Sequence, residues 1–295
     1  MFKSGFVAII GRPNVGKSTL LNQIIGEKIS IVSNKAQTTR NTIKLILNDE
    51  DSQIIFLDTP GFQNPKNKLG EFLLKESESS KAGADIITVL TDISDSIGKM
   101  DGIILEGLKD TKIPKVLLIN KIDLLENKEE IKSIIEMYED TGIFQKILPI
   151  SALNNEGLND YVKFIKDNLK EGPMYYPDDY ITDLPEKFIA QEIIREKALI
   201  YLDEEIPHGI MVEIESFKER SDKKIIDIDA TIYAEKDSHK GMVIGKNGAM
   251  LKKIGTDARL DLESFLDTKV NLKLWVKVDK NWREKERSLK NFGYK

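Results

Sequence analysis

Three observations predict a chain of two domains, an α/β domain with a mostly parallel, helix-covered sheet followed by a smaller α+β domain. Over residues 1–171, short apolar runs alternate with helical patterns, which is the order of right-handed βαβ units. A proline-rich stretch, 172–185, interrupts this alternation. Beyond it, the expected strands alternate apolar and polar residues, as strands with one solvated face do.

The composition supports this division and excludes several protein classes. A chain of 295 residues is long for one α/β domain, and 40% of its residues are hydrophobic, enough for two cores. It has no cysteine for disulfides or thiolate metal sites, and no apolar run as long as a membrane span. We therefore expect a cytoplasmic protein. The net charge of −5 argues against a globally basic nucleic-acid binder, so any RNA contact needs a local patch.

The first domain, 1–171, is expected to contain six strands with helices between most of them. The strands are predicted at 6–10, 43–47, 54–57, 86–90, 115–119 and 147–150. Helices are predicted after residue 17, at about 69–81 and 101–108, after residue 123, and at 158–169. Polar motifs directly follow several strands, and open α/β sheets bind ligands at that edge. The site is therefore expected at the carboxyl edge of the sheet.

The second domain, 186–295, follows the linker 172–185. Its elements are predicted in the order helix 186–202, strands 210–214 and 225–233, two helices around 245–248 with the second at 249–265, strand 270–278, and a basic helix 282–290. Trp275 and Trp282, at the last strand and its exit, are interpreted as core anchors. His208 and His239 show no spacing typical of a metal site or a catalytic pair.

A glycine-flanked loop follows the first strand and opens the first helix. Its residues are Gly11, Arg12, Pro13, Asn14, Val15, Gly16, Lys17, Ser18 and Thr19. The glycines let backbone N–H groups approach phosphate oxygens, and the helix directs its positive end toward them. Lys17 supplies charge to the outer phosphates, and the Ser18 hydroxyl is a ligand for Mg²⁺. This pattern predicts a nucleoside triphosphate site; a turn that binds nothing is the alternative.

A second phosphate-side motif ends the strand 54–57. It consists of Asp58, Thr59, Pro60 and Gly61, with Phe62 next. Asp58 is expected to hold Mg²⁺ through water, and the Gly61 N–H to meet the γ-phosphate. The four-residue pattern alone is weak, because it is common in turns.

The strand 115–119 ends in a motif that predicts the base. Asp123 can accept hydrogen bonds from the N1–H and the amino group of guanine, a pair of donors that adenine lacks. Lys121 is expected to pack along the base, and Asn120 to tie this loop to the phosphate loop. After the next strand, Ser151 and Ala152 are expected to offer a backbone N–H to guanine O6. Helix capping is the alternative, but four ordered strand-end motifs favour GTP.

These motifs resemble a translation-factor-related P-loop GTPase domain, and the loop 37–40, Gln-Thr-Thr-Arg, resembles the effector loop of the Era branch. The resemblance implies that Thr39 completes Mg²⁺ coordination when GTP is bound. Phe62 stands where Ras-like enzymes have a glutamine, so catalysis is expected from positioning and charge by Lys17, Asn14, Thr39 and Gly61. In related enzymes an asparagine at the Asn14 position holds K⁺; a turn-forming role is the alternative.

A glycine loop in the second domain predicts RNA binding. Gly245, Lys246, Asn247 and Gly248 separate two helices, and this Gly-x-x-Gly pattern in this element order resembles a type II KH domain. Ile244 and Ile254 are expected to line a groove for unstacked bases. The stretch 238–256 contains no acidic residue. It contains four lysines, Lys240, Lys246, Lys252 and Lys253. A tight helix–helix turn with a solvated face is the alternative.

The two domains together resemble the Era family of bacterial GTPases over the whole chain. The resemblance implies a monomeric GTP/GDP- and Mg²⁺-dependent GTPase that binds the 3′ region of 16S rRNA in 30S ribosomal subunit assembly. It also implies peripheral contact with the cytoplasmic face of the cell membrane. Two alternatives stay open. One is a nucleotide-gated RNA-binding module with incidental hydrolysis, and the other is a different ribosome- or tRNA-related GTPase of the same branch.

Overall fold

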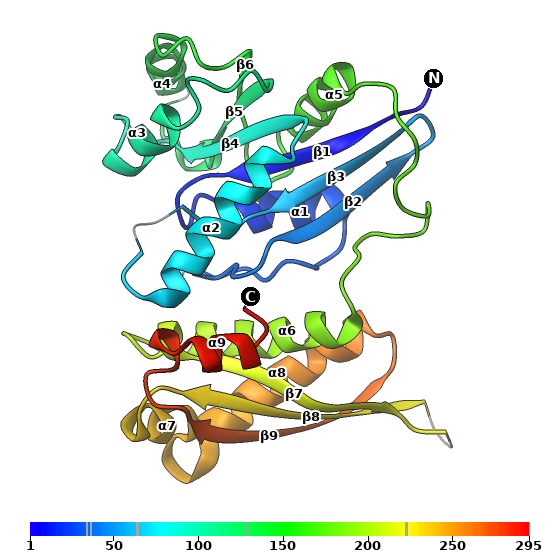
Figure 1. The fold of residues 1–295 in the computed structure, drawn as a ribbon, viewed down its shortest axis with the longest axis vertical. Coiled ribbons are helices and arrows are strands. Elements are labelled where there is room, and N and C mark those ends of the chain that lie inside the picture. The colour runs from blue at the N-terminus through cyan, green and yellow to red at the C-terminus, as the bar shows by residue number, and fades with distance from the viewer. Residues whose placement is uncertain (34, 36, 63–64, 128, 222–223, 295) are drawn as a thin grey trace. The chain divides into compact units, whose positions relative to one another are not determined.

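The computed structural model describes residues 1–294 except 34, 36, 63–64, 128 and 222–223. The chain forms two compact units. Unit 1 comprises Met1–Ser30, Thr39–Asn64 and Leu73–Asp183, and unit 2 comprises Ile31–Thr38, Pro65–Phe72 and Leu184–Lys295. Figure 1 shows the helices and strands of both units with their labels.

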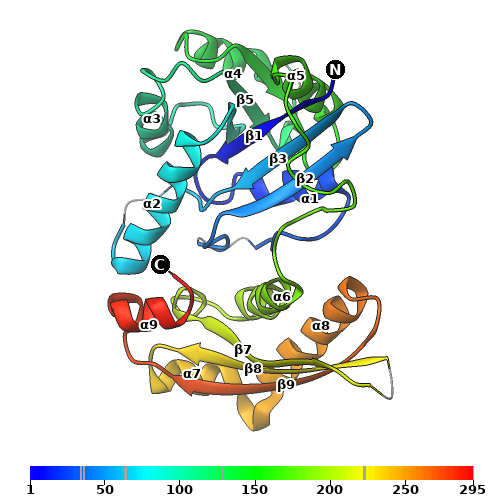
Figure 2. The same cartoon turned by 45° about the vertical axis from the view of Figure 1, so that its right-hand side comes forward.

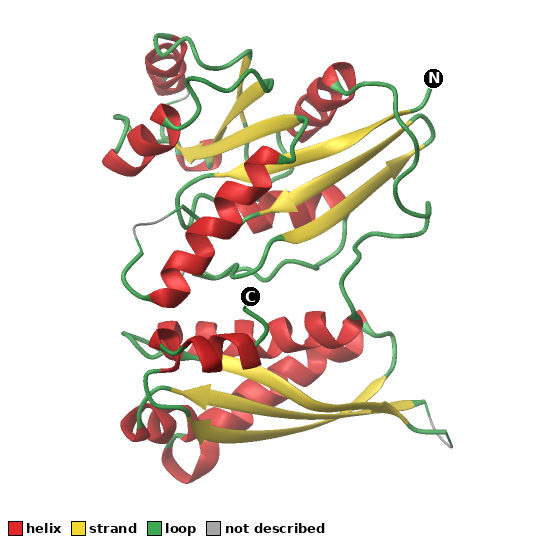
Figure 3. Cartoon of the chain, in the orientation of Figure 1, coloured by secondary structure: helices red, strands yellow, loops and turns green. Residues whose placement is uncertain are grey.

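Unit 1 contains the predicted, mostly parallel sheet. Its strands are β1 (Lys3–Ile10), β2 (Ile43–Asp49), β3 (Ser52–Asp58), β4 (Ile86–Asp92), β5 (Lys115–Asn120) and β6 (Lys146–Pro149). Among the described residues their order is β2-β3-β1-β4-β5-β6, and only β2 runs antiparallel to its neighbour (Figure 3). The β2–β3 hairpin aside, helical crossovers join the strands, so their carboxyl ends share one edge.

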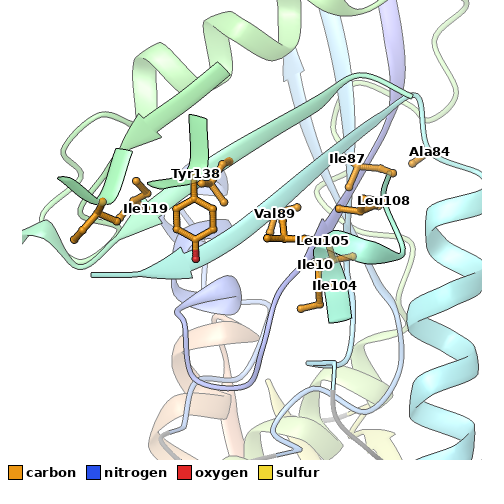
Figure 4. Close-up of a cluster of buried hydrophobic side chains, with 12 residues drawn as sticks. Ile10, Ala84, Ile87, Val89, Ile104, Leu105, Leu108, Ile119 and Tyr138 are labelled. Atoms are coloured by element: carbon orange, nitrogen blue, oxygen red, sulfur yellow. The ribbon is translucent and has the colours of Figure 1, made fainter. Parts of the chain in front are cut away.

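Helices cover both faces of this sheet. They are α1 (Lys17–Ile25), α2 (Lys68–Ala82, assigned to unit 1 from Leu73 on), α3 (Lys99–Glu106), α4 (Glu130–Glu139) and α5 (Leu158–Asn168). On one face, Leu105 and Tyr138 from α3 and α4 pack against strand residues such as Val89 in one hydrophobic cluster (Figure 4). On the opposite face, the Tyr161 hydroxyl of α5 lies 2.7 Å from that of Thr88. Successive residues of β4 point to opposite faces of the sheet, so Val89 packs under α3 and α4 while Thr88 contacts α5.

Unit 2 shows the predicted order of helices and strands. Its elements are α6 (Glu186–Tyr201), β7 (Met211–Glu219), β8 (Ile225–Ala234), α7 (Asp237–Ile244), α8 (Ala249–Phe265), β9 (Lys269–Val278) and α9 (Glu286–Asn291). β8 pairs antiparallel with β7 and parallel with β9, and α6 and α8 pack against this sheet (Figure 2). No helix in the described ranges of either unit is long and apolar enough to cross a membrane.

Two predictions at the C-terminal end are wrong. The stretch 282–290 is not one helix: a 3₁₀ turn, Trp282–Glu284, precedes α9, and Lys285 between them is extended. The Trp282 indole is buried and donates to the Gly209 carbonyl at 2.9 Å, which fixes the turn and confirms Trp282 as a core anchor. Trp275 is 45% exposed instead, because it shares the outer face of β9 with lysines.

Candidate functional site

The phosphate loop lies between β1 and α1, at the carboxyl edge of the sheet in unit 1. Gly16 adopts φ +102°, which disfavours L side chains, and a Cβ there would overlap the Asn120 amide nitrogen. A Cβ at Gly11 would overlap the Leu90 carbonyl oxygen. The two glycines predicted to allow close backbone approach are therefore sterically required at these positions.

Lys17 is buried at the start of α1 with its ammonium turned onto the loop. Its Nζ donates to the carbonyls of Gly11 at 3.2 Å and Arg12 at 3.0 Å. Burial lowers the pKa of Lys17 to about 8, and the nearby Asp58 carboxylate partly opposes this shift. A triphosphate would offer this ammonium anionic partners in place of neutral carbonyls.

Three predicted Mg²⁺ ligands come together beside Lys17. The Ser18 hydroxyl donates to Asp58 Oδ2 at 3.0 Å, and its oxygen lies 3.2 Å from that of Thr39. Burial raises the pKa of Asp58, while Lys17 and hydroxyl hydrogen bonds oppose the shift. Asp58 Oδ1 is buried with no hydrogen-bond partner. An orphaned carboxylate oxygen among hydroxyls fits a hydrated divalent cation, so these residues suit Mg²⁺.

The loop after β3 packs tightly against the phosphate loop. The Phe62 N–H donates to the Gly11 carbonyl at 3.0 Å, and a Cβ on Gly61 would lie 3.1 Å from Pro13 Cα. The Phe62 ring packs on the hydrophobic cluster below, with Lys81 Nζ 5.8 Å from its centre. Thr59 is buried and donates to the Ile9 carbonyl at 2.7 Å. Phe62 and Thr59 therefore have packing roles in this structure.

Asn120 joins the base loop (residues 120–123) to the phosphate loop, as predicted. Its Nδ2 donates to the Val15 carbonyl at 2.8 Å, and its Oδ1 accepts the Ala152 N–H at 2.9 Å. Asp123 Oδ1 accepts the Ser151 hydroxyl at 2.5 Å. Ser151 and Ala152 were expected to offer a backbone N–H to guanine O6, but here the Ala152 N–H donates to Asn120 and the Ser151 N–H donates to the Glu156 carbonyl at 3.1 Å.

Lys121 forms a second link between the two loops. It adopts φ +70°, and its Nζ donates to the Asn14 carbonyl at 2.8 Å. Asn14 is exposed, also with a positive φ of 65°. The base loop therefore holds the phosphate loop at Asn14 and at Val15, through one side chain each.

The sequence interpretation missed Asp92, which ends β4 beside these loops. Asp92 accepts a hydrogen bond from the Arg12 guanidinium, and its other oxygen lies 3.7 Å from Lys121 Nζ. The available signal was its position, because Asp92 follows a buried strand just as Asp58 and Asn120 do.

In unit 2, the Gly-x-x-Gly loop joins α7 to α8. Gly245, Asn247 and Gly248 have φ of 72°, 53° and 78°, and a Cβ on Gly245 would lie 2.7 Å from Met250 Cβ. Lys246 and Asn247 are exposed, and Gly248 has nothing within 4 Å of its Cβ position. The loop thus presents its backbone and polar side chains to solvent.

Some of the residues around this loop are exposed to solvent, and others are partly or fully buried or contact other side chains. Lys252 is exposed, Lys240 is half-buried, and Lys253 lies with its Nζ 4.0 Å from the centre of the Tyr201 ring. Ile244 is half-buried, as a groove residue would be. Ile254 is fully buried, so the expectation that it lines a groove is wrong: its position in α8 faces the core.

Comparison with known proteins matches both units to protein families. A model described as 50S ribosome-binding GTPase matches residues 6–121, and a KH domain model matches residues 205–283. A GTPase Era from Clostridioides difficile is 54% identical over 294 residues, covering 100% of this chain and 99% of the relative. This chain belongs to the Era family of GTPases. An Era protein from Caldicellulosiruptor saccharolyticus is also 54% identical, over 99% of this chain and 98% of the relative.

Solved Era structures share the complete fold of this Era-family chain. An Era in complex with MgGDPNP and nucleotides 1506–1542 of 16S ribosomal RNA is 40% identical, with TM-score 0.96, covering 100% of this chain and 99% of that one. A single-residue variant of Aquifex aeolicus Era bound to GDP·AlF₄⁻ is 39% identical, also with TM-score 0.96, over 99% of both chains. The predicted GTPase and KH domains are confirmed, and the chain is a GTP-hydrolysing enzyme.

Proposed function

We propose that this Era-family GTPase is a GTP-controlled switch that binds the 3′ region of 16S rRNA during assembly of the 30S subunit. The observation that carries the proposal is the pairing, on one chain, of the strand-end nucleotide site with an exposed Gly-x-x-Gly loop. The related Era that carries both MgGDPNP and 16S rRNA nucleotides supports this pairing. The domain limits we propose are 1–171, 172–185 and 186–295.

Each nucleotide-site residue has a role that its surroundings support. Lys17 binds the outer phosphates, and Asp123 accepts the N1–H and amino group of guanine. Ser18, Asp58 through water and, in the GTP state, Thr39 would hold Mg²⁺, and the ion would neutralise charge developing on the phosphates. Loss of the γ-phosphate releases Thr39 and Gly61, and their loops carry the change toward the RNA-binding state.

Without a glutamine to orient water, hydrolysis must rely on positioning and on charge stabilisation, and we propose that K⁺ supplies part of that charge. Phe62 has no hydrogen-bonding group with which to orient water, and its ring packs on the hydrophobic cluster. A K⁺ held partly by Asn14 would stabilise charge on the transferring phosphoryl group, together with Lys17 and the Gly61 N–H. Hydrolysis rates in K⁺ and Na⁺ buffers of equal ionic strength test this. Equal rates would contradict it.

The RNA-binding residues surround the Gly-x-x-Gly loop. Its backbone approaches sugar-phosphates closely because Gly245 and Gly248 lack side chains, and Lys246 and Asn247 add a charge and an amide. Further contacts come from the loop's neighbours: Lys240, Ile244, Lys252 and Lys253. The crosslinked RNA, recovered from cells and sequenced, should map to one site near the 3′ end of 16S rRNA. Reads scattered over messenger RNA would overturn the assembly role.

The absence of a glutamine at position 62, where Phe62 stands, favours a second candidate, a nucleotide-gated RNA-binding module whose hydrolysis is incidental. Single-turnover GTP hydrolysis with and without the 16S 3′ segment separates the two. RNA that accelerates hydrolysis supports the switch, whereas RNA that binds without changing the rate supports the passive module.

We place the protein in the cytoplasm as a monomer, with peripheral contact at the cytoplasmic face of the membrane. Fractionation of cells at low and high salt tests the membrane contact, because an electrostatic peripheral association is released by salt. Sedimentation with GDP and with a non-hydrolysable GTP analogue tests the monomer.

A further inference from the structure

The Arg12 side chain points away from the phosphate loop and contacts two carboxylates, those of Asp92 and Asp101. Its Nη2 donates to Asp92 Oδ1 and, at 3.0 Å, to the Ser94 hydroxyl, while its Nε lies 3.2 Å from Asp101 Oδ2. Asp92 ends β4, and Asp101 belongs to the first turn of α3. One guanidinium therefore bridges two elements that carry none of the nucleotide motifs.

Asp101 is a buried carboxylate, and burying a charged group costs hydration free energy. It is only 4% exposed, and burial raises its pKa, with Arg12 opposing the shift and Asp92 reinforcing it. An apolar residue at such a position usually stabilises a fold as well or better, because a buried ion pair must overcome the loss of hydration. The Arg12 side chain is itself 26% exposed, so only Asp101 is buried in this pair, and the position of the contacts rather than their strength points to a role at the loop.

Asp92 extends the contact to the base loop and closes a ring. Its second oxygen lies 3.7 Å from Lys121 Nζ, which donates to the Asn14 carbonyl at 2.8 Å. Arg12 and Asn14 lie two positions apart in the phosphate loop, so the ring runs from the Arg12 side chain through Asp92 and Lys121 back to the same loop. The Arg12 carbonyl also accepts from Lys17 Nζ at 3.0 Å.

We propose that Arg12 is a positioning residue for nucleotide binding. Asp92 and Asp101 hold its guanidinium outside the phosphate loop, and Asp92 connects it to Lys121. The backbone of residues 12–14 is thereby set relative to the base loop before the nucleotide arrives. This inference rests on the proposed nucleotide site. Pre-ordering the binding loop lowers the cost of binding, so its loss appears in affinity more than in the chemical step.

The first test is Arg12→Met, which keeps an unbranched apolar stem and removes the guanidinium with its charge and its hydrogen-bond donors. We expect GDP to dissociate about tenfold faster and KM for GTP to rise by a similar factor, with kcat within about twofold. Arg12→Lys is expected to rescue only partly, because an ammonium lacks the planar fork that reaches both carboxylates. GDP dissociation unchanged in Arg12→Met would overturn the proposal.

A double variant separates positioning from simple stabilisation. Arg12→Met leaves Asp101 buried without its counter-ion, so Tm should fall. Arg12→Met combined with Asp101→Asn removes that buried charge, and Tm should recover while GDP still dissociates fast. Recovery of both Tm and GDP affinity in the double variant would show a structural role alone and would overturn the proposal.

The proposed base site is tested separately with Asp123→Asn. If that variant binds GTP as the unaltered protein does, the assignment of the base site fails. If Asp123→Asn loses GTP but Arg12→Met keeps it, the base site stands and the positioning role of Arg12 fails. The two failures therefore give different results.

Discussion

The side-chain amide of Asn120 donates to the carbonyl of Val15 at 2.8 Å, across 105 positions of the chain. The same side chain accepts the Ala152 N–H, and Asn120 is 3% exposed. One buried amide thus satisfies backbone groups of two loops, and its Nδ2 fills the space that a Cβ on Gly16 would need. The phosphate loop and the base loop are built as one unit.

Replacing Asn120 by alanine should damage both stability and nucleotide binding. The Val15 carbonyl and the Ala152 N–H would be left buried without partners, at a cost of roughly 2–4 kcal/mol. Denaturant unfolding and GDP affinity measure the two effects. Asn168→Ala is the matched control: its amide also donates to a backbone carbonyl, of Phe164 at 2.8 Å, but in an exposed position. Its effect should stay within about 0.5 kcal/mol, and equal losses for both variants would contradict the prediction.

Replacing Asp123 by asparagine should change the preferred base. The asparagine keeps one acceptor oxygen but replaces the other by an NH₂ group that faces a guanine donor, so GTP affinity should fall by roughly two to four orders of magnitude. Xanthine carries an oxygen in place of that amino group, and the asparagine amide can donate to it. Competition between GTP and XTP for the site measures the switch. A variant that still prefers GTP would show that Asp123 does not face the base.

Nucleotide binding should take up a proton in mildly alkaline solution. In the free protein, burial lowers the pKa of Lys17 to about 8. Bound phosphates favour the charged ammonium and raise the pKa of Lys17. Below about pH 8 Lys17 is therefore charged in both the free and the bound protein. Above that pH the free protein has lost the proton and binding must restore it, so affinity falls as pH rises. Calorimetry of GDP binding at about pH 8.5 in buffers of different ionisation enthalpy should report this uptake. Binding heats independent of the buffer would contradict it.

Replacing Gly248 by aspartate should weaken RNA binding and leave GTP affinity unchanged. The carboxylate would lie where the loop backbone is proposed to approach phosphates, so we expect a loss of about tenfold or more from repulsion. Gly142→Asp is the matched control, since Gly142 also has a positive φ, 63°, and open space around its Cβ position. Loss of RNA binding in both variants would point to unfolding, and loss of GTP binding with Gly248→Asp would show that the domains do not act separately.

Strand-end position predicted the nucleotide site well, because a parallel sheet brings carboxyl ends to one edge whatever the loops between them. Ser18 and Asp58 come together as this rule predicts, and Thr39, which was expected from the family resemblance rather than from strand position, lies beside them. Asp92 obeys the same rule, but no neighbouring motif singles it out. Its contact with Arg12 depends on how β4 lies beside β1. Such a side-chain contact depends on the tertiary structure and cannot be predicted from the spacing of residues in the sequence.

The errors in the second domain have local and tertiary causes. Trp275 lies two positions from Lys273 and from Lys277 along β9, so the sequence already placed its side chain with theirs on the solvated face of the strand. The prediction of a core position rested on the size of the indole instead. The break before α9 has no such signal. It follows from the buried hydrogen bond of Trp282 with Gly209, 73 positions away.

β9 forms one edge of the sheet in unit 2, and its backbone can serve as a template for a strand from another molecule. Lys269, Lys273 and Lys277 are exposed along this edge strand, on the same side as Trp275. Lys269 and Lys277 form ion pairs with Glu263 and Glu215, and two copies meeting edge to edge would crowd these charged, hydrated groups together. The lysines therefore make self-association through the sheet unfavourable and oppose aggregation at the one exposed tryptophan of the described chain.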